Sequence, residues 1–311
     1  MEFKHGRQHS PAMLDEFKRL LAQDAWPMRQ ALVLADELVS HAHPAAERVI
    51  NQLKQARHPN AVALAHRLDQ CQHRLRQYFQ LEKIGPDLLD LTYRQNGYVF
   101  FRNQQPSRKL LVIFSTMFNN FYLSNLAMFQ LVRGLGCHVL LLKDASLANY
   151  HRGVDGFATD MPGIADRLRV IASETGVDHI SLTGFSSGGY AAMLTSLLLP
   201  GSNYLGFSHP TDLSAGSPRP PGQFFTPDVM AQLDPRWLLD LRPRLEQADP
   251  TGRRILVYGD QSVQDSLHAD HLNGVAGIEL ICLQGTGHNT IQSLMADGRL
   301  VDLFSRLVAD R

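Results

Sequence analysis

The sequence has few cysteines and no excess of charge of either sign. Its 311 residues include 3 cysteines, too few and too scattered for a disulfide framework or a zinc cage. The 30 Lys and Arg balance the 30 Asp and Glu, so the basic surface that binding to a phosphate backbone requires is missing. We therefore expect no nucleic-acid partner, no metal and a reducing, cytoplasmic compartment.

Long apolar runs are also missing. None approaches the roughly 18 residues that a transmembrane helix needs, and residues 1–7 lack the apolar core of a signal peptide. We expect a soluble protein without a membrane span. With 44% hydrophobic and 19% charged residues, the chain is too apolar for disorder, and its length predicts about two domains.

Up to about residue 80 the hydrophobic periodicity is that of helices. Ser10 and Pro11 suit the start of a first helix. Three more are expected over 26–41, from residue 44, and from residue 60 to about 80. Such helices are typical of a small bundle or of helical-repeat hairpins. We predict a helical domain over residues 1–85 and assign to it a protein partner or a second copy of this chain.

After residue 86 β-branched and aromatic runs alternate with helical patterns. Strands are expected over 98–102, 110–115, 138–143, 179–183, 204–208, 254–258 and 279–283. Helices are expected over 120–135, 162–175, 187–199, 264–274 and 290–308. This alternation predicts an α/β domain over 86–311, with a mostly parallel central sheet flanked by helices. The Pro-rich block 211–250 predicts an insertion that serves as a small lid.

The sharpest local motif is Gly184-Phe185-Ser186-Ser187-Gly188, between a predicted strand and a predicted helix. A serine on a sharp strand-to-helix turn needs small residues two before and two after it, and Gly184 and Gly188 meet that need. The helix that follows directs its N–H groups at an oxyanion beside Ser186. A plain Gly-Ser loop is the competing interpretation; a nucleotide P-loop is excluded because no Gly-Lys-Ser/Thr follows.

A serine nucleophile needs a base, and His288 lies between the last predicted strand and the last predicted helix. Most of the 14 histidines sit on helices or beside turns. His268 and His271 share one helix face at a metal-like spacing, but no further ligand cluster supports a metal.

The acid that orients the base is expected after the strand over 254–258, where two candidates compete. Asp260 directly follows Gly259 and suits a turn. Asp265 opens the next helix and suits a cap. We favour Asp265, because a carboxylate at a helix N-terminus stays ionised beside the dipole. Asp212 is a weaker third candidate.

Together these residues resemble the α/β-hydrolase superfamily in their order, Ser186, an aspartate, His288, and in the Gly-flanked turn. The resemblance covers roughly residues 95–311. It implies an oxyanion hole formed by the N–H of Ser187 and by a second N–H near Met117, in the loop that also holds Phe118 and Asn119. The usual His-Gly is missing from that loop, so Asn119 or Tyr122 as pocket-lining residues are alternatives. Ser262 stands where the common Gly-x-x-Asp spacing places the acid, so both aspartates stay open.

The resemblance implies acyl transfer without a cofactor. The expected activity is a serine hydrolase, a carboxylesterase or thioesterase that acts on a small-molecule acyl ester or thioester through an acyl-enzyme on Ser186. An acyltransferase with the same triad is one alternative. A helical interaction protein with a hydrolase-like scaffold is another. Several aromatic residues predict either an apolar pocket or ordinary core packing: Phe118, Phe121, Tyr122, Phe185, Phe224 and Phe225.

Overall fold

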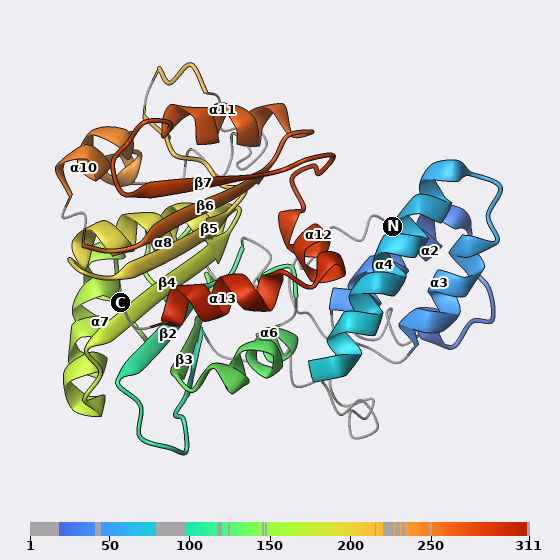
Figure 1. Cartoon of the computed structure of the whole chain (residues 1–311), viewed down its shortest axis with the longest axis horizontal. Coiled ribbons are helices and arrows are strands. Elements are labelled where there is room, and N and C mark those ends of the chain that lie inside the picture. The colour runs from blue at the N-terminus through green and yellow to red at the C-terminus, as the bar shows by residue number, and fades with distance from the viewer. Residues whose placement is uncertain are drawn as a thin grey trace. The chain divides into compact units, whose positions relative to one another are not determined.

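A computed structural model of the chain (Figure 1) describes residues 19–40, 45–78, 97–116, 120–123, 125–144, 146, 148–214, 216–219, 227, 231, 234–248 and 251–309. The chain packs as two compact units. The first comprises Met1–Gln95, Tyr122–Val132 and Ile291–Asp302, and the second Asn96–Phe121, Arg133–Thr290 and Leu303–Arg311. The expected boundary at residue 85 lies outside the described ranges. None of the helices in those ranges combines the length and apolarity that crossing a bilayer takes.

The second unit is built on a seven-stranded sheet of order β1-β3-β2-β4-β5-β6-β7. The strands are β1 (Tyr98–Phe101), β2 (Lys109–Phe114), β3 (His138–Leu142), β4 (His179–Phe185), β5 (Asn203–Phe207), β6 (Arg254–Gly259) and β7 (Ile278–Leu283). Only β1 pairs antiparallel with its neighbour, and the other pairs are parallel. The predicted α/β class with a mostly parallel sheet is confirmed, and each strand lies within two residues of its predicted ends.

Apolar side chains cover both faces of the sheet, because alternate residues of a strand point to opposite sides. On β2, Leu110, Val112 and Phe114 join the core beneath α7 (Met161–Thr175) and α8 (Ser187–Leu198). On the other face Phe121, Phe207 and Phe304 pack ring against ring. Phe304 lies on α13 (Leu300–Val308), which Figure 1 shows across the sheet from α7 and α8. A parallel sheet buried on both faces accounts for the nearly continuous apolar strands.

Two predicted helices differ from the structure. The single helix expected over 290–308 is two, α12 (Thr290–Asp297) and α13. Gly298 separates them with φ 78°, a left-handed conformation that ends a helix at little cost for glycine. The helix expected over 120–135 is shorter: α6 spans Asn125–Val132 and continues as the 3₁₀ turn η2, Arg133–Leu135. Tyr122, with φ 74°, breaks the helical path before it.

Three further helical elements of the second unit precede or follow β6 in the sequence. They are α11 (Val263–His271), α10 (Arg242–Gln247) and the 3₁₀ turn η4 (Pro235–Trp237). The last two belong to the block predicted as an insertion over 211–250. A bridge between Asp212 and Asp240 closes that block at its base.

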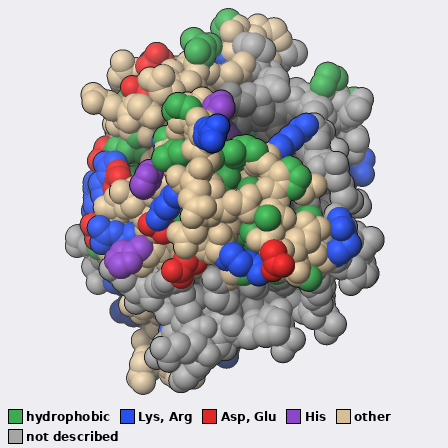
Figure 2. Space-filling model, turned by 90° about the vertical axis from the view of Figure 1, so that its right-hand side faces the viewer, with side chains coloured by type: hydrophobic (Ala, Val, Ile, Leu, Met, Phe, Trp, Pro, Cys, Tyr) green, Lys and Arg blue, Asp and Glu red, His purple; other side chains and the backbone are tan. Residues whose placement is uncertain are grey.

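The first unit contains α2 (Met28–Ser40), α3 (Ala46–Lys54) and α4 (Pro59–Tyr78). The apolar residues of α3 lie at helical spacing and are all buried: Ala46, Val49, Ile50 and Leu53. The helix expected from Ser10 lies largely outside the described residues. On the face that Figure 2 views, apolar side chains and charges of both signs are interspersed among the described residues. That mixture agrees with the charge balance of the sequence.

Candidate active site

Ser186 occupies a sharp turn between β4 and α8. Its φ of 53° and ψ of −124° lie outside the regions that a residue with a side chain normally adopts. The surrounding backbone fixes this conformation: Ser186 donates its N–H to the Phe207 carbonyl at 2.9 Å, and its own carbonyl accepts from the Gly189 N–H at 3.0 Å. The strained turn lifts the Ser186 side chain out of the strand and toward the residues that follow β6 and β7.

The glycines around Ser186 allow backbone to approach backbone. A Cβ on Gly184 would lie 2.2 Å from the Gly188 carbonyl oxygen, and a Cβ on Gly188 would lie 2.5 Å from the carbonyl oxygens of Phe114 and Ser115. Neither position has room for a side chain, because those atoms belong to the backbone. This close packing seats the start of α8 against the ends of β2 and β4.

The structure brings Ser186, His288 and Asp265 together. His288 Nε2 lies 3.1 Å from Ser186 Oγ, and His288 Nδ1 lies 3.0 and 3.1 Å from the two oxygens of Asp265. An ionised carboxylate only accepts hydrogen bonds, so Nδ1 carries the proton and Nε2 accepts from the Ser186 hydroxyl. The Asp265 side chain is fully buried, whereas that of His288 is 31% exposed.

Asp265 takes its place from the start of α11. Ser262 caps this helix, and its hydroxyl accepts from the Asp265 N–H at 3.3 Å. The carboxylate thus sits in the first helical turn, where the macrodipole favours a negative charge. Its two oxygens face the imidazole of His288, which is the arrangement that holds one tautomer and one ring orientation.

Asp260 contacts the loop before His288 and not the imidazole. It is exposed, and its carboxylate accepts from the Gly285 N–H at 2.8 Å. Gly259 beside it lets this loop approach, because a Cβ there would lie 2.2 Å from the Thr286 carbonyl oxygen. The Gln261 N–H donates to that same carbonyl at 2.9 Å. Asp260 therefore braces the loop from outside.

A second histidine, His209, lies beneath the nucleophile turn. His209 follows β5, donates from Nδ1 to the Pro210 carbonyl at 2.8 Å, and accepts at Nε2 from the Tyr204 hydroxyl at 2.6 Å. Burial lowers the pKa of His209 to about 4, against the opposing effects of the Pro210 carbonyl and Asp265. A neutral ring thus supports Gly189, where a Cβ would come within 2.6 Å of it.

The residues named for the oxyanion hole are described only in part. Ser187 is buried and is the first residue of α8. Met117, Phe118 and Asn119 lie outside the described residues. The ends of their loop are joined, since Thr116 donates its N–H to the Asn120 carbonyl at 2.7 Å.

Three of the aromatic residues expected near a pocket are buried. Tyr122 belongs to the first unit, where its hydroxyl donates to Asp36 at 2.7 Å. Phe121 lies in the core of the second unit. Phe185 remains beside the site, with its ring centroid 5.2 Å from that of His288. Phe224 and Phe225 lie outside the described residues.

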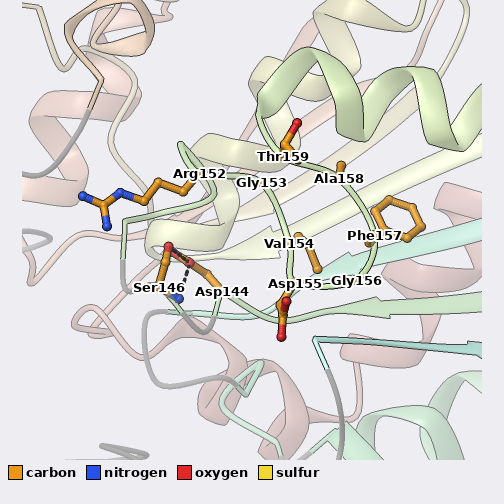
Figure 3. Close-up of a pocket in the computed structure, with 10 residues that line it drawn as sticks. All are labelled: Asp144, Ser146, Arg152, Gly153, Val154, Asp155, Gly156, Phe157, Ala158 and Thr159. Carbon is orange, nitrogen blue, oxygen red and sulfur yellow. Dashed lines mark hydrogen bonds between the residues drawn. The ribbon is translucent and has the colours of Figure 1, made fainter.

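A cavity of about 720 Å³ opens after β3, at the same sheet edge as Ser186. Its lining runs from Asp144 to Thr159 and includes none of Ser186, Asp265 and His288. Figure 3 shows Arg152 and Phe157 on opposite sides of it, with Ser146 hydrogen-bonded to Asp144 at 2.6 Å.

The two histidines with metal-like spacing contact residues of the block 211–250. His271 Nε2 lies 2.7 Å from Asp240, and Asp212, within 4.8 Å of both, pairs with the Arg219 guanidinium at 3.2 Å. The Arg219 guanidinium therefore places a positive charge beside one member of this group, Asp212. Asp212, the weaker third candidate for the acid, belongs to this group of contacts and not to those around His288.

The strand order, the single antiparallel edge strand, the turn at Ser186 after the central strand β4 and the histidine after β7 decide the fold. The chain has an α/β-hydrolase fold. No protein-family model and no curated protein matches its sequence. Similar solved structures include a carboxylesterase structure from the thaumarchaeon Nitrososphaera gargenis, with 13% identity over 68% of this chain and 92% of that chain and a TM-score of 0.45.

MenH from S. aureus is similar at 14% identity over 69% of this chain and 97% of that chain, with a TM-score of 0.47. An alpha-beta serine hydrolase homologue from Coxiella burnetii is similar at 15% identity over 68% and 89%, with a TM-score of 0.42. Likenesses this distant carry no information on activity. The chemistry of this α/β-hydrolase fold follows from the contacts of its own residues.

Proposed function

We propose that this protein is a serine hydrolase that cleaves a carboxylic ester or thioester through an acyl-enzyme on Ser186. One observation carries the proposal: Ser186 Oγ, both ring nitrogens of His288 and the Asp265 carboxylate form a continuous hydrogen-bonded chain of 3.0–3.1 Å contacts. Such a chain supplies a general base to a hydroxyl that is otherwise a weak nucleophile.

In the first half-reaction His288 Nε2 accepts the Ser186 proton as Oγ forms a bond to the acyl carbonyl carbon. The carbonyl electron pair moves to oxygen, and the N–H of Ser187 at the start of α8 stabilises that charge. When the oxyanion collapses, the bond to the leaving alkoxide or thiolate breaks, and His288 returns the proton to it. Asp265 stabilises the imidazolium throughout.

In the second half-reaction water replaces the leaving group. His288 Nε2 accepts a proton from the water as its oxygen attacks the acyl carbon, and collapse restores the Ser186 hydroxyl with release of a carboxylic acid. The 31% exposure of the His288 side chain is compatible with the access that this water needs. The apolar ring of Phe185 at 5.2 Å favours an uncharged acyl group beside the imidazole.

Turnover of p-nitrophenyl esters of rising chain length, together with acyl thioesters, tests the proposal. We expect hydrolysis of at least one of these, and its loss in Ser186→Ala, by about 10⁴-fold or more in kcat. Ser173→Ala is the matched control, because it removes the hydroxyl of an exposed serine on α7. A folded wild type that hydrolyses none of the substrates faster than Ser186→Ala would contradict the proposal.

A further inference from the structure

A buried polar cluster in the first unit joins three segments that are far apart in the sequence. Asp36 on α2 accepts from the Tyr122 hydroxyl at 2.7 Å and from the Gln292 side-chain amide at 3.1 Å. The same amide nitrogen lies 2.9 Å from the Tyr122 hydroxyl. The main-chain carbonyl of Gln292 accepts from the Cys71 thiol on α4 at 3.2 Å. All four residues belong to the first unit, and the exposed fractions of Asp36, Tyr122 and Gln292 are 9, 7 and 3%.

The burial of this cluster makes its hydrogen bonds consequential. Burial and the neighbouring Asp36 raise the pKa of Tyr122 well above its usual value, so its hydroxyl stays protonated and able to donate. Tyr122 also holds a φ of 74°, a conformation that a bulky side chain adopts only where its surroundings fix it. If Asp36 is removed, the Tyr122 hydroxyl and the Gln292 side-chain amide stay buried and lose the acceptor that they share.

The two segments that Asp36 contacts follow directly, in the sequence, after two loops of the candidate site. Tyr122 begins a segment directly after the loop 117–121, the loop named for the second oxyanion donor. Gln292 lies four residues after His288, in the first turn of α12. Thr290, the first residue of α12, donates its N–H to the His288 carbonyl at 2.9 Å. The chain therefore leaves each of these loops and enters the first unit within a few residues.

We infer that Asp36 is a positioning residue for catalysis: it anchors the segments after the oxyanion loop and after His288 on the helical unit. The inference rests on the proposed function of Ser186, His288 and Asp265. Both anchored segments are short, so a displaced anchor shifts groups that need near-ångström placement.

The test compares Asp36→Ala with Asp36→Asn in the full chain. Alanine removes the acceptor, whereas asparagine keeps an oxygen in the same place. We expect Asp36→Ala to lower kcat by about 10- to 100-fold with little change in KM, since misplacement of about 1 Å costs that much. Asp36→Asn restores most of the rate. Tyr122→Phe, which deletes one oxygen, gives an intermediate loss and supplies the comparison where Asp36→Ala fails to fold.

Val49→Ala is the matched control, because Val49 is fully buried in the same unit and takes no part in the cluster. It is compared at an equal fraction of folded protein. The second readout is the low-field NMR signal of the His288 Nδ1 proton, which we expect to shift or broaden in Asp36→Ala and to persist in Val49→Ala. Equal kcat and equal NMR spectra in the two variants would overturn the inference. An inactive wild type whose Nδ1 signal still responds to Asp36→Ala would instead contradict the proposed function alone.

Discussion

At the scale of residues, the two aspartates after β6 have separate tasks. Asp265 is buried and directs both oxygens to His288 Nδ1 at 3.0 and 3.1 Å. Asp260 is exposed and accepts from the Gly285 N–H. Sequence spacing leaves the choice between them open, because a turn position and a cap position suit an aspartate equally well. The backbone path of the loop over 260–265 separates them, and that path depends on the Ser262 cap and on the close approach at Gly259.

Substitution of each aspartate tests this division. We expect Asp265→Asn to lower kcat/KM by about 10⁴-fold, because an amide can no longer hold the Nδ1–H tautomer. Asp260→Asn keeps an oxygen for the Gly285 N–H and is expected to stay within about tenfold of wild type. The measurement is steady-state hydrolysis of the best ester, with folding checked by circular dichroism. A larger loss in Asp260→Asn than in Asp265→Asn would contradict the division.

Residues that act through long-range contacts lie beyond what sequence patterns can indicate. Asp36, Tyr122 and Gln292 meet across separations of 86 and 256 residues, and nothing in the periodicity of α2 marks Asp36. The contacts of His209 with a carbonyl and a hydroxyl likewise come from the structure alone. That Ser186 and His288 lie together could be predicted, because their signal is local: a Gly-flanked turn and a position after the last strand.

At the scale of elements, the strands were the most predictable part of the chain. A sheet buried on both faces demands apolar runs such as Leu110–Phe114, and turn residues bound each run. Helix ends were harder, since they depend on single backbone conformations. Gly298 in the left-handed region divides α12 from α13, although the apolar periodicity continues across it. Tyr122 shortens α6 for a reason that lies in the first unit.

The turn that carries Ser186 depends on its glycines. We expect Gly188→Ala to lower the free energy of unfolding by about 3 kcal/mol and to abolish hydrolysis, because the new Cβ would overlap two carbonyl oxygens at 2.5 Å. Gly134→Ala is the control: nothing lies within 4 Å of a Cβ there, so its stability and rate should match wild type. Chemical denaturation and ester turnover measure both. A Gly188→Ala protein with wild-type activity would show that the turn differs from the one described.

At the scale of the whole molecule, buried neutral histidines tie stability to pH. Burial lowers the pKa of His209 from 6.5 to about 4, so the unfolded chain binds its proton at a higher pH than the folded chain does. The stability contributed by the neutral ring is complete above pH 6.5 and is lost as the pH falls toward 4. At pH 5 the loss for this one histidine is about 2 kcal/mol.

His209→Asn removes this titration. We expect the fall in unfolding free energy between pH 7.5 and pH 5 to be smaller in His209→Asn than in wild type by about 2 kcal/mol. Tyr204→Phe serves as the control, because it deletes the hydroxyl beside Nε2 and keeps the buried histidine. Urea denaturation at the two pH values gives the difference. An unchanged pH dependence in His209→Asn would mean that the pKa of this ring is the same in the folded and the unfolded chain, against the lowered value given above.

Ser186 and His288 are 102 positions apart in the sequence and lie in contact at one edge of the sheet. We propose that this contact activates the Ser186 hydroxyl, and the rest of the mechanism depends on that claim. Reaction with a fluorophosphonate followed by peptide mass spectrometry tests that claim most directly, because the probe reacts with an activated serine whatever the natural substrate is. We predict one adduct, on the peptide that contains Ser186, absent from Ser186→Ala and strongly slowed in Asp265→Asn. A folded wild type that stays unlabelled at Ser186 would contradict the account.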